Sequence, residues 1–130
     1  MTAGDARADY LSFVADVKKE AAQYSADLGK PKASFQEYFR NSYTHFKRGM
    51  ADEDIQYVIN IYVPVFGLHP EVEVNVDETA VRVNGNEGKI SSNGIVYVEH
   101  GKELGRQGAS TYTLAYENNH WVISDIPRSS

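Results

Sequence analysis

The chain has 130 residues, of which 42% are hydrophobic and 24% charged, a balance typical of a soluble globular protein. It contains no cysteine, which excludes a disulfide framework, a thiol nucleophile and a thiolate metal site. No apolar run approaches the roughly 20 residues of a membrane-spanning helix, so we expect no membrane partner. The length predicts a single domain spanning residues 1–130 around one core.

The formal net charge of −5 is unevenly distributed. Residues 1–50 contain eight Lys/Arg and six Asp/Glu, whereas residues 51–130 contain five and twelve. Because nucleic-acid binding needs a basic face, we expect no nucleic-acid partner. The first residues lack the cationic start and apolar stretch of a secretory signal, which indicates a cytoplasmic protein or the mature form of an exported one.

The first half of the chain predicts three helices. Apolar residues recur at intervals of three and four, which favours helices over residues 10–28, 34–48 and 52–63. Ser34 and Glu37 form a capping box at the start of the second helix. We expect Asp52 to cap the third helix and Pro64 to end it.

After Pro70 the apolar period becomes two, as in "VEVNV" and "AVRVN", which is typical of half-buried strands. Turn-forming segments at 77–79, 84–88, 100–105 and 118–119 separate about five antiparallel strands. Asn93 and Gly94 predict a bulge or bend inside the third strand. We therefore predict an α+β fold in which three N-terminal helices pack on a curved antiparallel sheet that encloses a cavity.

The segments "VEVNVDETAVRVNG" and "GIVYVEHGKELGRQGASTYTLAYENNHWVISDI" resemble the C-terminal sheet of the NTF2-like superfamily, also called the SnoaL-like or cystatin-like cone. The shared features are Ala80 after an acidic turn, a charged turn containing glycine, the strand "STYTLAY", and Trp121 and Ile123 in the closing strand. The resemblance covers about the last 55 residues. It implies a cone-shaped domain in a family of isomerases, dehydratases, cyclases and epoxide hydrolases that also includes non-catalytic assembly, accessory and transport-adaptor domains.

A two-residue turn at Asn118 and Asn119 would fix the register of the last hairpin. It places three pairs on one face: Tyr116 with Trp121, Leu114 with Ile123, and Tyr112 with Asp125. A carboxylate in a partly dry cleft is a candidate general base or acid, and a phenol can donate to a developing oxyanion. We therefore name Asp125, Tyr112 and His45 as candidate catalytic residues. The alternative is that Asp125, at a strand end, points to solvent.

The other candidate site residues are expected to line a ligand cavity: Tyr38, Tyr43, Tyr62, Tyr97, Leu114, Tyr116, Trp121 and Ile123. For the tyrosines on helices, the alternative is a place in the core with the hydroxyl at the surface. The four histidines show no metal-ligand spacing and no phosphate-binding loop is present, so we expect no metal and no cofactor.

Two functions remain open from the sequence. The first is a homodimer, formed through its sheet, that binds an apolar small molecule and possesses isomerase, dehydratase or hydrolase activity if polar groups converge in a closed apolar cavity. The second is a non-catalytic interaction or assembly module. That function requires a cone plugged by Tyr and Phe side chains and an exposed apolar patch on the sheet or around residues 65–69.

Overall fold

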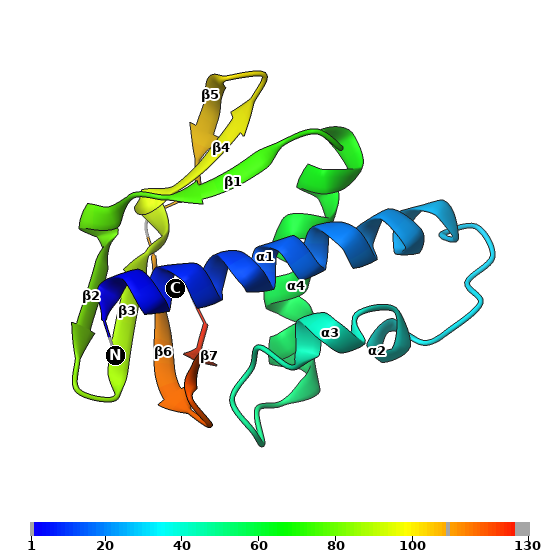
Figure 1. Cartoon of the computed structure of the whole chain (residues 1–130). Helices are drawn as coiled ribbons and strands as arrows, with labels where there is room; N and C mark the ends of the chain where they lie inside the picture. Colours follow the sequence, from blue (N-terminus) through cyan, green and yellow to red (C-terminus); the bar gives the residue numbers. More distant parts are fainter. Residues whose placement is uncertain (1, 109, 127–130) are drawn as a thin grey trace.

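The computed structural model describes residues 2–108 and 110–126, and Figure 1 shows how its elements are arranged. The helices are α1 (Ala3–Ala26), α2 (Phe35–Tyr38), α3 (Arg40–Tyr43) and α4 (Asp52–Leu68), with two short 3-10 helices, η1 (Glu78–Ala80) and η2 (Ser92–Gly94). The strands are β1 (Glu73–Val76), β2 (Val81–Asn84), β3 (Glu87–Ser91), β4 (Ile95–Glu99), β5 (Lys102–Arg106), β6 (Thr111–Glu117) and β7 (His120–Asp125).

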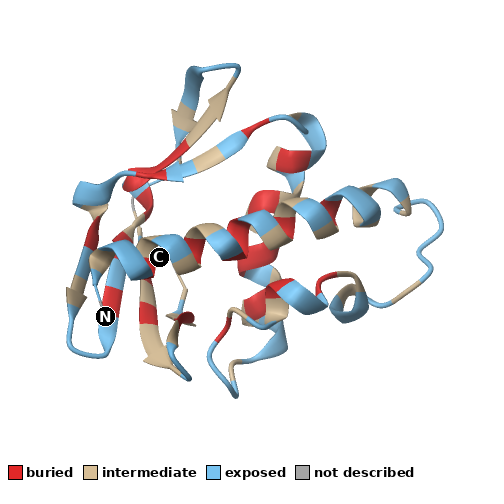
Figure 2. Ribbon diagram, viewed as in Figure 1, coloured by how far each residue is buried: buried red, intermediate tan, exposed pale blue. Residues whose placement is uncertain are grey.

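The strands form two antiparallel sheets, ordered β1-β4-β5 and β2-β3-β6-β7. Helix α1 contacts strands of both sheets and crosses α4, and buried positions gather where the two helices meet (Figure 2). The predicted α+β class is confirmed.

Helix α1 is the longest element and the centre of the packing. Thr2 caps it in a capping box with Asp5, because the Thr2 hydroxyl accepts from the Asp5 N–H while the Asp5 carboxylate accepts from the Thr2 N–H. Its buried face consists of Ala6, Tyr10, Phe13, Val14, Val17 and Ala21. This spacing of three and four residues confirms the predicted stripe from Tyr10 to Ala21 and places it against the core. The helix begins at Ala3 and ends at Ala26 rather than spanning residues 10–28, so Leu28 lies beyond it and is exposed.

Both predicted boundaries of the third helix are also wrong. Pro64 lies inside α4 rather than at its end, and the helix continues to Leu68. An internal proline removes one backbone hydrogen bond, whereas continuing the helix buries Phe66 in the core. The N-cap of α4 is Ala51 without a side-chain cap, so Asp52 is the first helical residue instead.

The predicted second helix is divided into α2 and α3 at Phe39. Half of the predicted capping box is present, since the Ser34 hydroxyl accepts from the Glu37 N–H at 3.2 Å. The Glu37 carboxylate accepts from the Ser34 hydroxyl and not from the Ser34 N–H. At α3, the Glu20 carboxylate accepts from the N–H groups of Asn41 and Ser42. A carboxylate from α1 thus binds the N–H groups that a continuous helix would have used internally.

The described residues contain more strands than predicted because two hairpin turns are tighter than expected. Glu87 pairs with Asn84 across a turn in which Gly85 has φ 61°. Lys102 pairs with Glu99 across His100 and Gly101, whose φ angles are 52° and 79°. Positive φ angles close two-residue hairpins, so residues that we assigned to turns extend as β3 and β5 instead.

The bend predicted at Asn93 and Gly94 is confirmed. The chain leaves β3 in one sheet, passes through η2 and enters β4 in the other sheet. A Cβ atom on Gly94 would lie 2.1 Å from the Cβ of Ala80, so η1 and η2 touch here without space for a side chain. The chain therefore passes from one sheet to the other where two short turns pack directly on each other.

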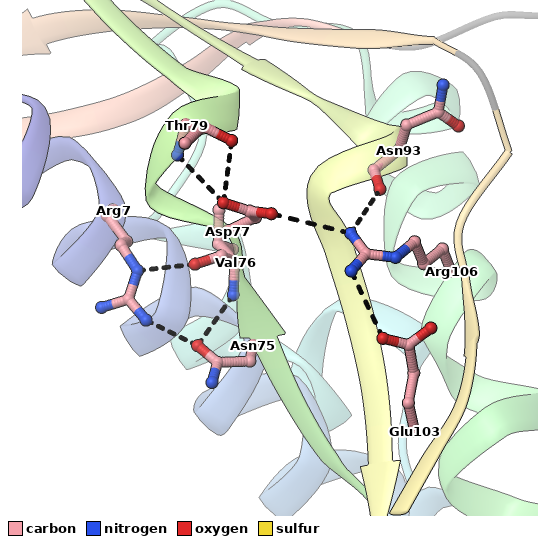
Figure 3. A network of polar contacts seen from close by, with 8 residues as sticks. All are labelled: Arg7, Asn75, Val76, Asp77, Thr79, Asn93, Glu103 and Arg106. Carbon is pink, nitrogen blue, oxygen red and sulfur yellow. Dashed lines mark hydrogen bonds and ion pairs between the residues drawn. The ribbon is translucent and has the colours of Figure 1, made fainter.

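Polar contacts hold the same corner (Figure 3). Asp77 caps η1 by accepting from the N–H and hydroxyl of Thr79. The other carboxylate oxygen of Asp77 lies 3.8 Å from the guanidinium of Arg106, which also donates to the Asn93 carbonyl. Arg106, at the end of β5, therefore links the two turns.

Two cations of α1 cover the outer edge of β1. Arg7 donates to the carbonyl of Val76 at 2.8 Å (Figure 3), and Lys18 donates to the carbonyl of Val72 at 2.9 Å. Unpaired strand edges can recruit other strands, and a covering helix prevents this. Helix α1 thus covers the edge of β1 at which a further strand could otherwise pair.

Carboxylates of α1 bind the elements on its other side. Asp9 accepts from the Trp121 N–H at 2.7 Å, Asp16 pairs with His45, and Glu20 binds the start of α3. Residues 9, 16 and 20 are spaced by seven and four, which places them on one face of a helix. Cations on one side of α1 and anions on another therefore fix it between β1 and β7.

We expect Gly94→Ala to destabilise the protein by about 1–3 kcal/mol or more, because the added methyl overlaps Ala80. Urea unfolding measures the change. The matched control is Gly105→Ala, whose added methyl would meet no atom within 4 Å, and which should change the free energy of unfolding by less than about 0.5 kcal/mol. Equal effects of the two substitutions would contradict the close packing of η1 on η2.

Candidate functional site

The β6–β7 hairpin follows the predicted register only in part. Asn118 and Asn119 form the turn with φ angles of 51° and 67°, and Leu114 pairs with Ile123 as expected. Beyond that pair the register shifts, so Asp125 lies opposite Thr113. The predicted pairing of Tyr112 with Asp125 is therefore wrong, because a bulge adds one residue to β7.

Asp125 is exposed, and one of its carboxylate oxygens accepts from the N–H of Ile126 at 2.9 Å. The alternative that Asp125 points to solvent at a strand end thus matches its position. The structure does not bring Asp125 to Tyr112, and the candidate acid–phenol pair is absent.

His45 lies beside β7, at the edge of the four-stranded sheet. Its Nε2 is 2.7 Å from the Asp16 carboxylate, and its ring packs edge-on against Phe13. Residues 45–47 pair alongside β7, because the Ile123 N–H donates to the His45 carbonyl and the Lys47 N–H donates to the Ile123 carbonyl. His45 therefore fastens an additional edge segment to α1, and the three candidate catalytic residues do not meet.

Tyr112 belongs instead to a hydrogen-bonded group of four phenols and one amide, here called the tyrosine cluster: Tyr10, Tyr62, Tyr97, Tyr112 and Gln107. The Tyr10 and Tyr62 hydroxyls form a short hydrogen bond. The Gln107 carbonyl oxygen accepts from Tyr62 at 3.3 Å and from Tyr97 at 3.4 Å. Its amide nitrogen donates to the Tyr112 hydroxyl at 3.1 Å.

The tyrosine cluster joins elements that are distant in sequence. Tyr10 comes from α1, Tyr62 from α4, Tyr97 from β4 and Tyr112 from β6. Gln107 follows β5, and its backbone N–H donates to the Ile95 carbonyl. This bond fixes the Gln107 side-chain amide at the centre of the tyrosine cluster. One side-chain amide with an acceptor and a donor can satisfy three phenols, so the polar groups of the tyrosine cluster are paired with one another, whereas the buried Trp121 Nε1 has no partner.

Burial sets the protonation of these phenols. It raises the pKa of Tyr62 well above its usual value, because a phenolate would be desolvated and would lie near Tyr112 and Tyr97. Burial likewise raises the pKa of Tyr10, Tyr97 and Tyr112. The cluster is therefore neutral at physiological pH and holds no general base.

Large side chains fill the rest of the cone. Tyr10, Tyr62 and Tyr112 are at most 2% exposed, as are the predicted cavity residues Leu114, Trp121 and Ile123. The Trp121 ring lies over Gly88, where an added Cβ would approach it to 3.3 Å, and it packs against the ring of Tyr116. These residues meet one another as a packed core.

Tyr38 and Tyr43 bind carboxylates at the protein surface. Tyr38 donates to Asp27 at 2.7 Å, and Tyr43 donates to Asp52 at 2.6 Å. Each phenol lowers the pKa of its carboxyl partner below the usual value, because the hydrogen bond favours the ionised form. Both tyrosines fasten loops around α2 and α3 rather than meeting the tyrosine cluster.

Surface pockets lie elsewhere. Four pockets with volumes of about 270 to 460 Å³ are lined by residues other than Asp125, Tyr112 and His45. The two that share lining residues lie along α1, beside the end of α4. Within residues 2–108 and 110–126, no three His, Asp or Glu side chains gather closely enough to bind a metal ion. No described helix has both the length and the apolar content needed to cross a membrane.

The sequence interpretation missed Gln107 as the centre of the polar interior. A glutamine after a strand carries no signal of burial, and its role depends on three phenols from distant segments. Tyr10 had a usable signal, since it is a hydroxyl-bearing aromatic within a predicted apolar stripe. A buried phenol requires a partner, which would have suggested a second polar residue in the core.

Comparison with known proteins gives one structural likeness. No protein-family model matches the chain, and no curated protein matches it in sequence. A crystal structure described as an NTF2-like transpeptidase from Campylobacter jejuni is similar, with a TM-score of 0.39 and 12% sequence identity. The similarity covers 80% of this chain and 93% of that one.

We expect the cluster phenols to resist ionisation as the pH is raised. The chain has nine tyrosines, of which four belong to the cluster, so we expect at most five to ionise while the protein is folded. Because the folded pKa values exceed the unfolded value of 10.0, the cluster stabilises the protein fully below pH 10.0 and loses this contribution as the pH rises above it. Phenolate absorbance recorded together with circular dichroism checks this, and reversible ionisation of all nine before unfolding would disprove it.

Proposed function

We propose that the domain is a non-catalytic binding module that acts through its outer surface. The observation that carries this proposal is the tyrosine cluster, in which neutral phenols and one amide satisfy one another inside the cone. An enzyme site would need an acid or base beside an open apolar cavity, whereas Asp125 is exposed at a strand end and His45 is paired with Asp16. The filled interior supports a rigid scaffold for contacts made elsewhere.

The C-terminal end of α4 supplies an exposed apolar element for such contacts. Leu68 is 78% exposed, whereas Phe66, two residues earlier, is buried in the core. A single exposed leucine is ordinary, but this one neighbours Gly67, which lines a surface hollow together with Phe66 and Pro70. This is the region around residues 65–69 in which the sequence suggested an interaction patch.

A second candidate is a small-molecule site at the rim of the tyrosine cluster. Tyr97 and Gln107 are half-buried, so the hydrogen-bonded network reaches the surface between β4 and the segment after β5. A ligand with an apolar ring and one polar group could exchange partners with Gln107 there. This candidate retains the cone-ligand interpretation without requiring catalysis or an open interior.

We expect indole, a small aromatic probe, to leave the wild-type core unchanged because no space remains beside Tyr62. In Tyr62→Ala the lost ring leaves a cavity that admits indole, and the substitution costs about 3–5 kcal/mol. The control Tyr62→Phe keeps the ring volume and should exclude indole. Chemical shifts measured by NMR during indole titration read out all three proteins.

The same titration separates the candidate functions. Shifts confined to Tyr97 and Gln107 in the wild type would favour the rim site. Shifts of Tyr10, Tyr62 and Tyr112 in the wild type would show that the cone admits ligands and would overturn the proposal. If Tyr62→Ala fails to fold, the titration of the wild-type protein alone still distinguishes these outcomes.

A further inference from the structure

The side of α4 that faces away from the core carries apolar side chains. They are spaced by four, three and four residues, which places them in one line along the helix: Tyr57, Ile61, Pro64 and Leu68. Residues that α4 buries in the core, such as Ile59 and Phe66, lie on the opposite side of the helix. We call the line of four residues the outer stripe of α4.

The outer stripe is accessible to another molecule. Leu68 is 78% exposed and Tyr57 is 41% exposed. Pro64 is exposed as well, and Ile61 is half-buried. A surface helix ordinarily has charged or polar side chains on the side away from the core. An apolar outer side is instead characteristic of a helix that another protein surface covers.

The stretch of α4 around the outer stripe is free of charge. Residues 55–68 contain no Asp, Glu, Lys or Arg, although 24% of the whole chain is charged. Asn60, an exposed neutral residue, lies beside the stripe. Because covering the outer stripe desolvates no charged group, contact with a second apolar surface has no electrostatic penalty there.

Opposite charges flank the outer stripe. Glu53 is exposed one turn before Tyr57, at the start of α4. Lys19 of α1 lines the hollow beside Gly67, near the other end of α4. In the part of the chain that the structure describes, neither Glu53 nor Lys19 forms an ion pair. The outer stripe therefore has a carboxylate at one end and an ammonium group at the other.

Other carboxylates near the C-terminal end of α4 face the β4–β5 hairpin. The Glu99 carboxylate lies 3.4 Å from His69 Nδ1, and the Glu71 carboxylate lies 3.3 Å from His100 Nε2. Lys19 lies on the other neighbour of α4, helix α1. Its ammonium group thus remains available to a carboxylate of another molecule.

This arrangement is complementary to itself. When a second copy is rotated by half a turn so that the two α4 helices run antiparallel, Tyr57 meets Leu68 and Ile61 meets Pro64. The spacing of four, three and four residues is that of the facing positions in paired helices. The same rotation brings Glu53 of each copy toward Lys19 of the other. A second copy thus matches both the apolar stripe and the charges that flank it.

We propose that two copies of the chain associate through the outer stripe of α4, with the two helices antiparallel about a twofold axis. This inference rests on the proposed function as a module that acts through its outer surface, and it names the surface and the partner. It places the dimer contact on α4 rather than on the sheet, where the sequence suggested it. The outer stripe is about 17 Å long at 1.5 Å per residue, so the interface is small and the dissociation constant should be about 10–500 µM.

Sedimentation equilibrium of the full-length protein between about 5 µM and 1 mM tests self-association. We expect the apparent mass to rise from 14.5 kDa toward twice that value. Leu68→Glu should weaken association about tenfold or more, because it places a carboxylate within the apolar contact. The matched control is Leu104→Glu, which makes the same change at a 49% exposed leucine of β5 and should dimerise as the wild type does. Circular dichroism checks that both variants fold.

Charge reversal tests whether the occupant is a second copy. Lys19→Glu and Glu53→Lys should each weaken association about threefold or more, because each brings two like charges together. The double variant restores both opposite-charge pairs and should return the dissociation constant to within about twofold of the wild-type value. An unrelated partner keeps its own charges, so this restoration is expected only of a second copy. The control Lys89→Glu, on an exposed residue of β3, should leave association unchanged.

Several results would overturn the inference. A protein that remains monomeric at about 1 mM would do so, as would a Leu68→Glu variant that dimerises like the wild type. Loss of the dimer in Leu104→Glu would assign the contact to the edge of β5 instead. A double charge variant as weak as either single variant would reject the antiparallel pairing. None of these results depends on indole uptake, so failure here is distinguishable from failure of the filled-cone proposal.

Discussion

The hydrogen bonds among Tyr10, Tyr62, Tyr112 and Gln107 are the constraint on which the interior depends. They join α1, α4, β6 and the segment after β5, which lie far apart in the sequence. Buried phenols are costly when unpaired, so each of these elements must take the position that completes the network. The same pairing occupies the hydroxyl and amide groups of the cluster with one another. Fold and proposed function thus share one physical cause.

Helix α1 divides the molecule into an interior and a working surface. Its buried face packs on the core, its carboxylates hold β7 and α3, and its cations Arg7 and Lys18 cover the edge of β1. A further stripe of α1, which includes Ala15, Ala22 and Ser25, lines surface hollows beside the end of α4. A helix fixed on its other sides presents this stripe in a constant geometry. Such preorganisation favours binding because little conformational entropy is lost on association.

Local patterns predicted the fold better than the site. The stripe of α1, the cap at Ser34, the bend at Gly94 and the Asn118–Asn119 turn depend on neighbouring residues, and each was predicted from the sequence. The helix end predicted at Pro64 was wrong because burial of Phe66 outweighs the backbone hydrogen bond that proline cannot make. Asp125 was misplaced by a single bulge, since one added residue reverses the face of every later side chain. Gln107 and the Asp16–His45 pair join distant segments, so no spacing within either segment signals them.

The central claim is that the phenols fill and close the cone, and the hydroxyl protons of Tyr10 and Tyr62 report on it directly. NMR of the wild-type protein in neutral water should show these protons as separate resonances, because a buried hydrogen bond slows their exchange with solvent. Tyr62→Phe should remove one resonance and shift the other, which assigns them. The absence of slowly exchanging hydroxyl protons at both tyrosines would mean that water reaches the cluster. That result would contradict a closed interior and return the cone to consideration as a ligand cavity.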